Sequence, residues 1–288
     1  MYNPVSTYRF QFHKAFTFAD FEKIIPYLKK LGVGTVYASP IFTAVPGSNH
    51  GYDSLDPHHI NPEIGTLEHL YEIKANLKED GLGWLQDIVP NHMAFDPRNT
   101  MLMDVLEKGQ QSVYAAIFDV GWTSTVYEGK MMVPFLGSPL VDTIANKEVK
   151  LSFHENRLVL QYYESSYPLH PRSYQTILDR IEEQPLALQQ LLEQMQGLKE
   201  KEDPKLYAQA WEEWLLQLTS LYRNEAIKKT LDGVLQMIND DATALMDIAN
   251  EQEYRLCHWQ ETDRQINYRR FFTVNGLICL NIQDEHVY

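Results

Sequence analysis

Cysteine is scarce in this sequence, which has only Cys257 and Cys279 among 288 residues. Two cysteines cannot form the disulfide framework of a small secreted protein, so a reducing, cytoplasmic setting is expected. The N-terminal segment also lacks the apolar stretch behind a basic start that marks a secretory signal peptide. No apolar run approaches the roughly 18 residues that a membrane-spanning helix needs, and no membrane partner is expected.

Positive charge is the second shortage. Lysine and arginine number 25 against 39 aspartate and glutamate, a formal net charge of -14. This acidic balance argues against nucleic acid or anionic lipid as the main partner. The sequence also lacks the Gly-x-Gly-x-x-Gly and Walker-type loops that hold nucleotides, and the Gly-x-Ser-x-Gly elbow of serine hydrolases. No cofactor is therefore expected.

Strand and helix signals alternate through the first 95 residues. Apolar patterns predict strands over 6–12, 33–39 and 82–89, with helices over 17–31 and 66–80 between them. Glycine and proline mark 47–62 as a long loop. This order is typical of a parallel sheet covered by helices.

The pattern changes after residue 95. Residues 96–147 are expected to be irregular, and a hairpin is expected around Glu155-Asn156. Apolar residues then recur at helical spacing from 174 to 252, where Pro185 and the 200–204 stretch divide three or four helices. This shift in composition predicts a domain boundary.

Polar side chains gather after the second and third expected strands. In a parallel sheet, ligand-facing groups lie at the carboxyl ends of strands and in the loops that follow. Asp87 falls inside an apolar strand, where a lone carboxylate is costly unless it is paired. An Asn-His pair beside a tyrosine can bond sugar hydroxyls while the aromatic face covers the ring. The candidate residues of this active-site mouth are Asn49, His50, Tyr52, Asp53, Asp87, Asn91 and His92.

Other interpretations of these residues stay open. Taken singly, Asp87 could pair with a buried arginine, His92 could be a packing histidine, and Tyr52 could belong to the core. Nitrogen and oxygen ligands for a divalent ion are also numerous, but no His-Glu-x-x-His or Cys-x-x-Cys spacing organises them, so no metal is predicted. The residues of that alternative are His50, Asp53, Asp56, His58, His59, Asp87 and His92.

The segment Asp87-Ile-Val-Pro-Asn-His92 resembles the first conserved region of the α-amylase superfamily, at the end of the third strand of a (β/α)8 barrel. Within that superfamily the chain is similar to the maltooligosyltrehalose synthases over nearly its whole length. The segments that carry this similarity are 6–13, 37–41, 46–53, 61–65 and 267–272.

The resemblance implies an α/β fold, namely a partial TIM (β/α)8 barrel with a large, mostly helical insertion after the third strand. Residues 1–95 would form the first three βα units, and 96–265 the insertion, irregular and hairpin first and then a helical bundle. Residues 266–288 would return towards the fourth barrel strand.

The resemblance also implies an activity, the isomerisation of the reducing-end α-1,4 linkage of a maltooligosaccharide to an α,α-1,1 linkage in trehalose biosynthesis. Such an enzyme is a (1→4)-α-D-glucan 1-α-D-glucosylmutase, and its partner is the maltooligosaccharide. By the same resemblance Tyr52 would stack on a sugar and His92 would bond its hydroxyls. Asn49 and His50 would line the same subsite, with Asp53, Asp87 and Asn91 as supporting groups.

The catalytic carboxylates of that chemistry are not identified. Retaining glycoside chemistry needs two carboxyl groups about 5–5.5 Å apart, and the family's nucleophile lies in a Gly-x-Arg-x-Asp segment that is not found after residue 95. The nucleophile and the acid/base carboxylate are expected beyond Tyr288, so this chain alone is expected to be inactive. An open barrel edge would also make it prone to self-association.

Four rival interpretations remain. They are an α-amylase-type hydrolase, a non-catalytic glucan-binding protein, a metal-dependent hydrolase, and a glycosidase that uses Asp53 and Asp87 as its carboxylate pair.

Overall fold

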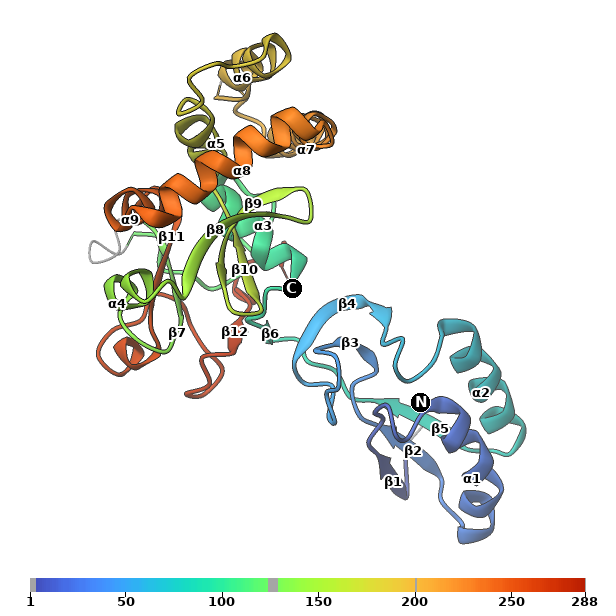
Figure 1. The fold of residues 1–288 in the computed structure, drawn as a ribbon. Helices are drawn as coiled ribbons and strands as arrows, with labels where there is room; N and C mark the ends of the chain where they lie inside the picture. Colours follow the sequence, from blue (N-terminus) through green and yellow to red (C-terminus); the bar gives the residue numbers. More distant parts are fainter. Residues whose placement is uncertain (1–3, 124–128, 200, 288) are drawn as a thin grey trace. The chain divides into compact units, whose positions relative to one another are not determined.

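A computed structural model describes residues 4–123, 129–199 and 201–287 (Figure 1). The chain divides into two compact units, which are described separately: unit 1 is 1–99 with 270–288, and unit 2 is 100–269. The predicted α/β class is confirmed. The strands of the described residues form five small sheets and no closed barrel. Among the helices described, none is long and apolar enough to cross a membrane.

Unit 1 is built on a parallel sheet in the order β1-β2-β5. Arg9, Tyr37 and Leu85 lie in register across its three strands. The predicted strand–helix–strand–helix–strand order is therefore confirmed here. The elements of unit 1 are β1 (Thr7–Phe10), α1 (Phe18–Leu31), β2 (Thr35–Ala38), β3 (Phe42–Ala44), β4 (Ser54–Ile60), α2 (Leu67–Glu79), β5 (Gly83–Gln86), β6 (His92–Ala94) and β12 (Leu277–Cys279).

The first helix begins and ends where its sequence dictates. The Asp20 carboxylate accepts hydrogen bonds from the backbone N–H and the hydroxyl of Thr17, at 3.1 and 2.9 Å, which satisfies a free donor at the helix start. Gly32 ends the helix in the left-handed conformation, with φ of 79°. The apolar face, including Phe21 and Leu28, is fully buried against the sheet.

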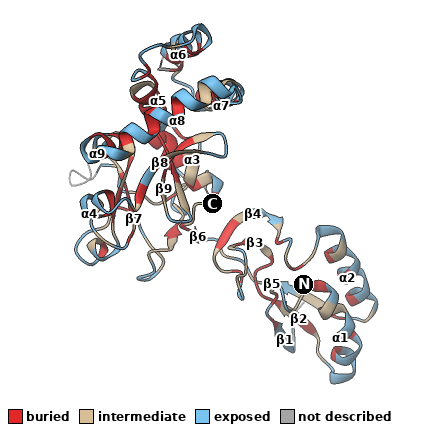
Figure 2. Ribbon diagram, viewed as in Figure 1, coloured by how far each residue is buried: buried red, intermediate tan, exposed pale blue. Residues whose placement is uncertain are grey.

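Alternation along the strands sorts the side chains of unit 1 onto two faces. Phe10 and Val36 belong to the apolar core that α1 and α2 cover, and Trp84 packs against it. The outer surfaces of the two helices are exposed (Figure 2). Arg9 and Tyr37 alternate with these residues and so lie on the other face. The sheet thus presents polar side chains on the face away from its helices.

Two local predictions in unit 1 are wrong. The expected long loop over 47–62 contains β4, which pairs antiparallel with β3 through an irregular register; Pro57 does not break it because proline is tolerated on edge strands. The third strand is shorter than expected and ends at Gln86, so Asp87 follows the strand and does not lie inside it. Its N–H still bonds to the Ala38 carbonyl, at 2.9 Å.

Unit 2 combines an antiparallel sheet in the order β10-β9-β8 with a parallel pair, β7 and β11. Helix α8 packs on β8, and α3 packs on β10 (Figure 1). Its elements are α3 (Thr100–Lys108), β7 (Met131–Leu136), α4 (Leu140–Ala145), β8 (Val149–His154), β9 (Arg157–Tyr162), β10 (Ser165–Pro168), α5 (Pro171–Leu178), α6 (Leu186–Lys199), α7 (Pro204–Tyr222), α8 (Glu225–Asp240), α9 (Ala242–Asn250) and β11 (Tyr254–His258), with short 3-10 turns at Gly109–Gln111 and Trp259–Asp263.

The hairpin predicted around Glu155 and Asn156 is confirmed, and both turn residues have positive φ. The prediction that residues 96–147 are irregular is wrong, because α3, β7 and α4 lie in this range. Residues 124–128 of the range are outside the described residues. The helical stretch holds more helices than expected. Asn224 and Asp241 each accept hydrogen bonds from the backbone as N-caps and start α8 and α9.

Candidate functional site

The candidate site centres on Asp87, at the carboxyl end of β5. One of its oxygens, Oδ2, accepts hydrogen bonds from the Tyr52 hydroxyl at 2.6 Å and the Tyr37 hydroxyl at 3.1 Å. The bond to Asp87 raises the pKa of Tyr52, and burial adds to this, so Tyr52 remains a neutral phenol that donates. Asp87 is therefore paired, and the partners that the structure shows are the two tyrosines and not the arginine considered from the sequence.

Arg9 on β1 joins this cluster from the other side of Tyr52. Its Nη2 lies 3.3 Å from the Tyr52 hydroxyl oxygen, and its guanidinium carbon lies 5.7 Å from the centre of the Tyr37 ring. The bond to Tyr52 raises the pKa of Arg9, which stays cationic. The Tyr52 hydroxyl is thus held between a cation and a carboxylate, and its ring orientation is fixed at both sides.

Gln11 ties the loop before β4 to the first strand. Its side-chain amide donates to the Asn49 carbonyl at 2.6 Å and its oxygen accepts from Arg9 at 3.1 Å. The side chains of Asn49 and His50 are exposed. His50 Nδ1 accepts the Tyr52 N–H at 3.0 Å. These contacts bring the predicted residues Asn49, His50 and Tyr52 to one place.

Gly51 lets this loop lie against the end of β2. It has φ of 76°, and a Cβ built on it would be 2.6 Å from the Pro40 carbonyl oxygen. No other residue type meets both conditions without strain.

The neighbouring carboxylate, Asp53, accepts a hydrogen bond from the Ser48 hydroxyl at 2.5 Å. Asp53 and Asp87 therefore have different partners.

His92 is buried, with 3% of its surface exposed, and it contacts the backbone of the loop that holds Tyr52. Its ring stacks on Phe271 with centroids 4.1 Å apart. Nε2 lies 3.1 Å from the Tyr52 carbonyl oxygen and Nδ1 lies 2.9 Å from Asn91 Oδ1. Burial lowers the pKa of His92, so the neutral ring has one N–H for these two oxygens. A sugar contact through His92 stays a prediction, and it requires one of these contacts to give way.

Three residues of the cluster were not among the predicted site residues: Arg9, Gln11 and Tyr37. A signal was available, because Arg9 and Gln11 alternate with Phe10 and Phe12 and so share the face away from the core. Tyr37 follows from the register, which sets it beside Arg9. Within the residues described, no three histidine, cysteine or acidic side chains are close enough to hold a metal ion.

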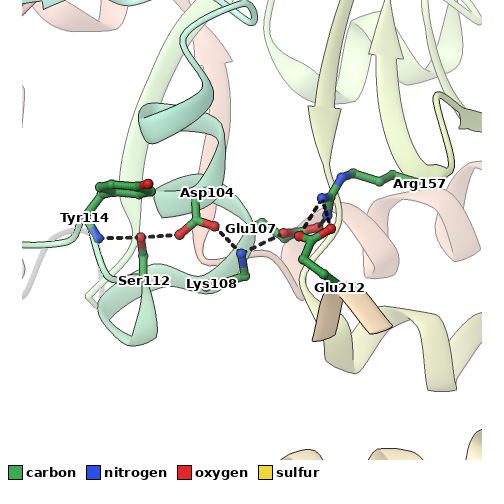
Figure 3. Close-up of polar contacts among 7 residues, drawn as sticks. All are labelled: Asp104, Glu107, Lys108, Ser112, Tyr114, Arg157 and Glu212. Atoms are coloured by element: carbon green, nitrogen blue, oxygen red, sulfur yellow. Dashed lines mark hydrogen bonds and ion pairs between the residues drawn. The ribbon is translucent and has the colours of Figure 1, made fainter. Parts of the chain in front are cut away.

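A second polar cluster lies in unit 2 and links α3, β9 and α7 (Figure 3). Glu107, whose side chain is 3% exposed, pairs with Arg157 and with Lys108, the latter at 3.3 Å. Lys108 also pairs with Asp104, and Arg157 with Glu212 at 2.7 Å. These ion pairs join α3, β9 and α7 within unit 2, so we assign the cluster a structural role.

A family model described as "Alpha amylase, catalytic domain" matches residues 18–114. A protein of Mycobacterium tuberculosis named as a maltooligosyl trehalose synthase is 42% identical over 141 residues, which is 46% of this chain and 18% of that protein.

Solved structures extend the likeness to nearly the whole chain. The DSM5389 glycosyltrehalose synthase matches with a TM-score of 0.69 at 29% identity, over 98% of this chain and 30% of its own. A maltooligosyl trehalose synthase matches with a TM-score of 0.68 at 29% identity, over 99% of this chain and 29% of its own. The chain thus spans less than a third of the length of each of these relatives.

Proposed function

We propose that this chain, a relative of the maltooligosyltrehalose synthases in the α-amylase superfamily, forms part of the substrate-binding side of an enzyme that rearranges α-1,4-glucans. The reaction would move the reducing-end linkage of a maltooligosaccharide to an α,α-1,1 linkage by intramolecular transglucosylation. The partial-barrel interpretation, with unit 1 as its beginning and unit 2 as an insertion, belongs to the same proposal.

The observation that carries the proposal is the Asp87–Tyr52–Arg9 arrangement. A neutral phenol held by a carboxylate 2.6 Å away and a guanidinium 3.3 Å away cannot swing freely. A fixed, partly exposed aromatic ring beside polar groups is suited to a flat, hydroxyl-rich ligand, because the ring covers apolar sugar surface while neighbouring groups bond its hydroxyls. Asp87 and Arg9 act through Tyr52, and Asn49 and His50 would border the same sugar.

The chemistry of bond exchange requires groups beyond this cluster. Asp87 is engaged by two hydroxyls and Asp53 by a third, and neither has the partner expected of an acid or a nucleophile. The nucleophile segment Gly-x-Arg-x-Asp is not found after residue 95 of the sequence. We therefore propose that the 288-residue chain binds maltooligosaccharides without turning them over.

Calorimetric titration with maltopentaose tests the binding proposal. Tyr52→Ala should abolish the stacking surface, and Asp87→Asn should weaken binding by about tenfold because the ring loses its anchor. Asp56→Asn is a matched control, since Asp56 contacts His58 and His59 on β4 and not this cluster. Wild-type affinity in Tyr52→Ala would contradict the assigned site.

Product analysis tests the reaction. A longer enzyme that contains this chain should convert maltopentaose to a product without a reducing end. Release of glucose and maltose instead would favour the α-amylase-type hydrolase. Turnover by the 288-residue chain that is lost in Asp87→Asn would favour the Asp53/Asp87 glycosidase.

A further inference from the structure

One turn in unit 1 holds an aromatic residue in a backbone conformation that aromatic residues rarely adopt. Phe272 has φ of 52°. It is the second residue of a four-residue turn closed by the Val274 N–H, which donates to the Phe271 carbonyl at 3.2 Å. Positive φ at this position belongs to turn types dominated by glycine and asparagine, because a side chain at Cβ is strained there.

Burial does not compensate this strain. Phe272 is 80% exposed, so most of its apolar ring faces solvent. Its ring packs edge to face on Phe271, with the two ring centroids 4.4 Å apart. A residue that is both strained and exposed contributes little to the fold, and strain of this kind tends to collect at ligand sites.

The position of the turn connects Phe272 to the candidate site. Phe271 is fixed by its N–H, which donates to the Leu277 carbonyl at 2.9 Å, and by stacking on His92. His92 in turn contacts the Tyr52 carbonyl. The rings of His92, Phe271 and Phe272 therefore contact one another in series, from the buried His92 to the exposed Phe272.

We propose that Phe272 is a glucan-contacting residue, which offers its exposed ring to a glucosyl unit next to the one that Tyr52 covers. This inference rests on the proposed function and extends it by naming a second stacking surface. An α-1,4-glucan fits the chemistry, because successive glucosyl units each present an apolar face of C–H groups bordered by hydroxyls. A single sugar would need one ring, and a chain of sugars can use two.

The strained backbone supplies a sharp test, because stability and binding should respond to Phe272→Gly in different ways. Glycine adopts φ of 52° freely, so the melting temperature of the full chain should stay the same or rise. Loss of the ring should weaken maltopentaose binding by about tenfold in calorimetric titration. Phe272→Tyr keeps an aromatic ring and should bind as the wild type does.

Two matched variants serve as controls. Tyr163→Gly in unit 2 relieves the same strain, since Tyr163 has φ of 50° and is 64% exposed, and it calibrates the change in melting temperature. Tyr27→Ala removes an exposed ring from α1 and should leave binding unchanged.

The outcomes separate the two proposals. If wild-type protein binds maltopentaose and Phe272→Gly binds equally well, the role of Phe272 is overturned and the proposed function stands. If Phe272→Gly lowers the melting temperature, the ring serves the fold, and this inference is again overturned. If the wild-type chain shows no affinity for maltopentaose, both proposals fail together.

Discussion

Replacing Arg157 by methionine tests the charged cluster of unit 2 (Figure 3). Arg157 pairs with Glu107 and, through Nη2, lies 2.7 and 2.8 Å from the two Glu212 oxygens. The methionine retains much of the packing volume but not the charge. In the variant, the remaining ion-pair partner of Glu107 is the Lys108 ammonium, which also pairs with Asp104.

The two contacts of Arg157 should differ in energy. The side chain of Glu212 is 50% exposed, and an ion pair of that exposure contributes less than about 1 kcal/mol. The side chain of Glu107 is 3% exposed, and removing one partner of a buried pair costs about 3–5 kcal/mol. Because Lys108 still compensates part of the Glu107 charge, the loss in free energy of unfolding should be at most about 3–5 kcal/mol, which lowers the melting temperature by at most about 6–20 °C.

The loss should also depend on pH. Burial raises the pKa of Glu107, and Arg157 and Lys108 counteract part of this effect. Since the folded state holds this proton more tightly than the unfolded state, the group favours folding at low pH and loses that effect as pH rises through its folded-state pKa. Without Arg157 the pKa rises further, so the variant should be penalised more at pH 8 than at pH 5.

Urea denaturation of the full chain, monitored by tryptophan fluorescence, measures the free energy of unfolding of wild type and variant at pH 5 and at pH 8. Trp211 and Trp214 are buried in α7 and report on the unit that holds the cluster. Glu212→Gln should cost less than about 1 kcal/mol, and adding Glu107→Gln to Arg157→Met should restore most of the stability. A loss below about 1 kcal/mol, or an equal loss at both pH values, would refute the reasoning.

Four further expectations concern unit 1, a buried thiol and the open sheet. Gly51→Ala should cost about 2 kcal/mol or more in thermal unfolding, and more than Gly32→Ala, which has φ of 79° but no atom within 4 Å of the new Cβ. Asp20, whose pKa Lys23 and Thr17 lower to about 2, should stabilise the fold above its ordinary pKa and lose this effect as pH falls towards 2, so Asp20→Ala should flatten the acid limb of a stability profile. Burial raises the pKa of Cys257 to about 12, so iodoacetamide should label it only after unfolding, and rapid labelling of native protein would contradict its position. If the exposed β5 edge drives self-association, light scattering should show oligomers whose mass grows with concentration, whereas a monomer at all concentrations would contradict this.

Much of unit 1 could be predicted from the sequence because its signals are local. The Thr17–Asp20 cap, the helical spacing of Phe21 and Leu28, and Gly32 all determine α1 without reference to the rest of the chain. The strand β4 could not be found this way, since its sequence carries proline and two histidines and its pairing depends on β3. Likewise, β7 and β11 pair across more than 100 residues, and no local pattern encodes that contact.

The candidate site shows the same division. Tyr52 and Asp87 could be selected because each follows a recognisable strand, and the structure brings them to 2.6 Å. Arg9 and Tyr37 lie inside strands. Alternation with the apolar residues indicates their face, but only the register reveals that they lie side by side, where both contact the Tyr52–Asp87 pair. The burial of His92 beneath Phe271 could not be predicted either, because those residues are about 180 positions apart in the chain.

The antiparallel pairing of β6 with β12 has a consequence for the order of folding. Ala94 pairs with Leu277, so the ribosome synthesises about 180 residues between these two strands of unit 1. At about 5–20 residues per second, the ribosome takes roughly 10–40 s to deliver the second part. If the intervening chain were unfolded, closing this loop would cost about 4–5 kcal/mol from its length alone. Once unit 2 has folded, residues 100–269 are ordered and no longer contribute the entropy of a flexible loop. Mutations that slow the folding of unit 2 should therefore delay the β6–β12 pairing, and with it the completion of the candidate site around His92, without touching that site.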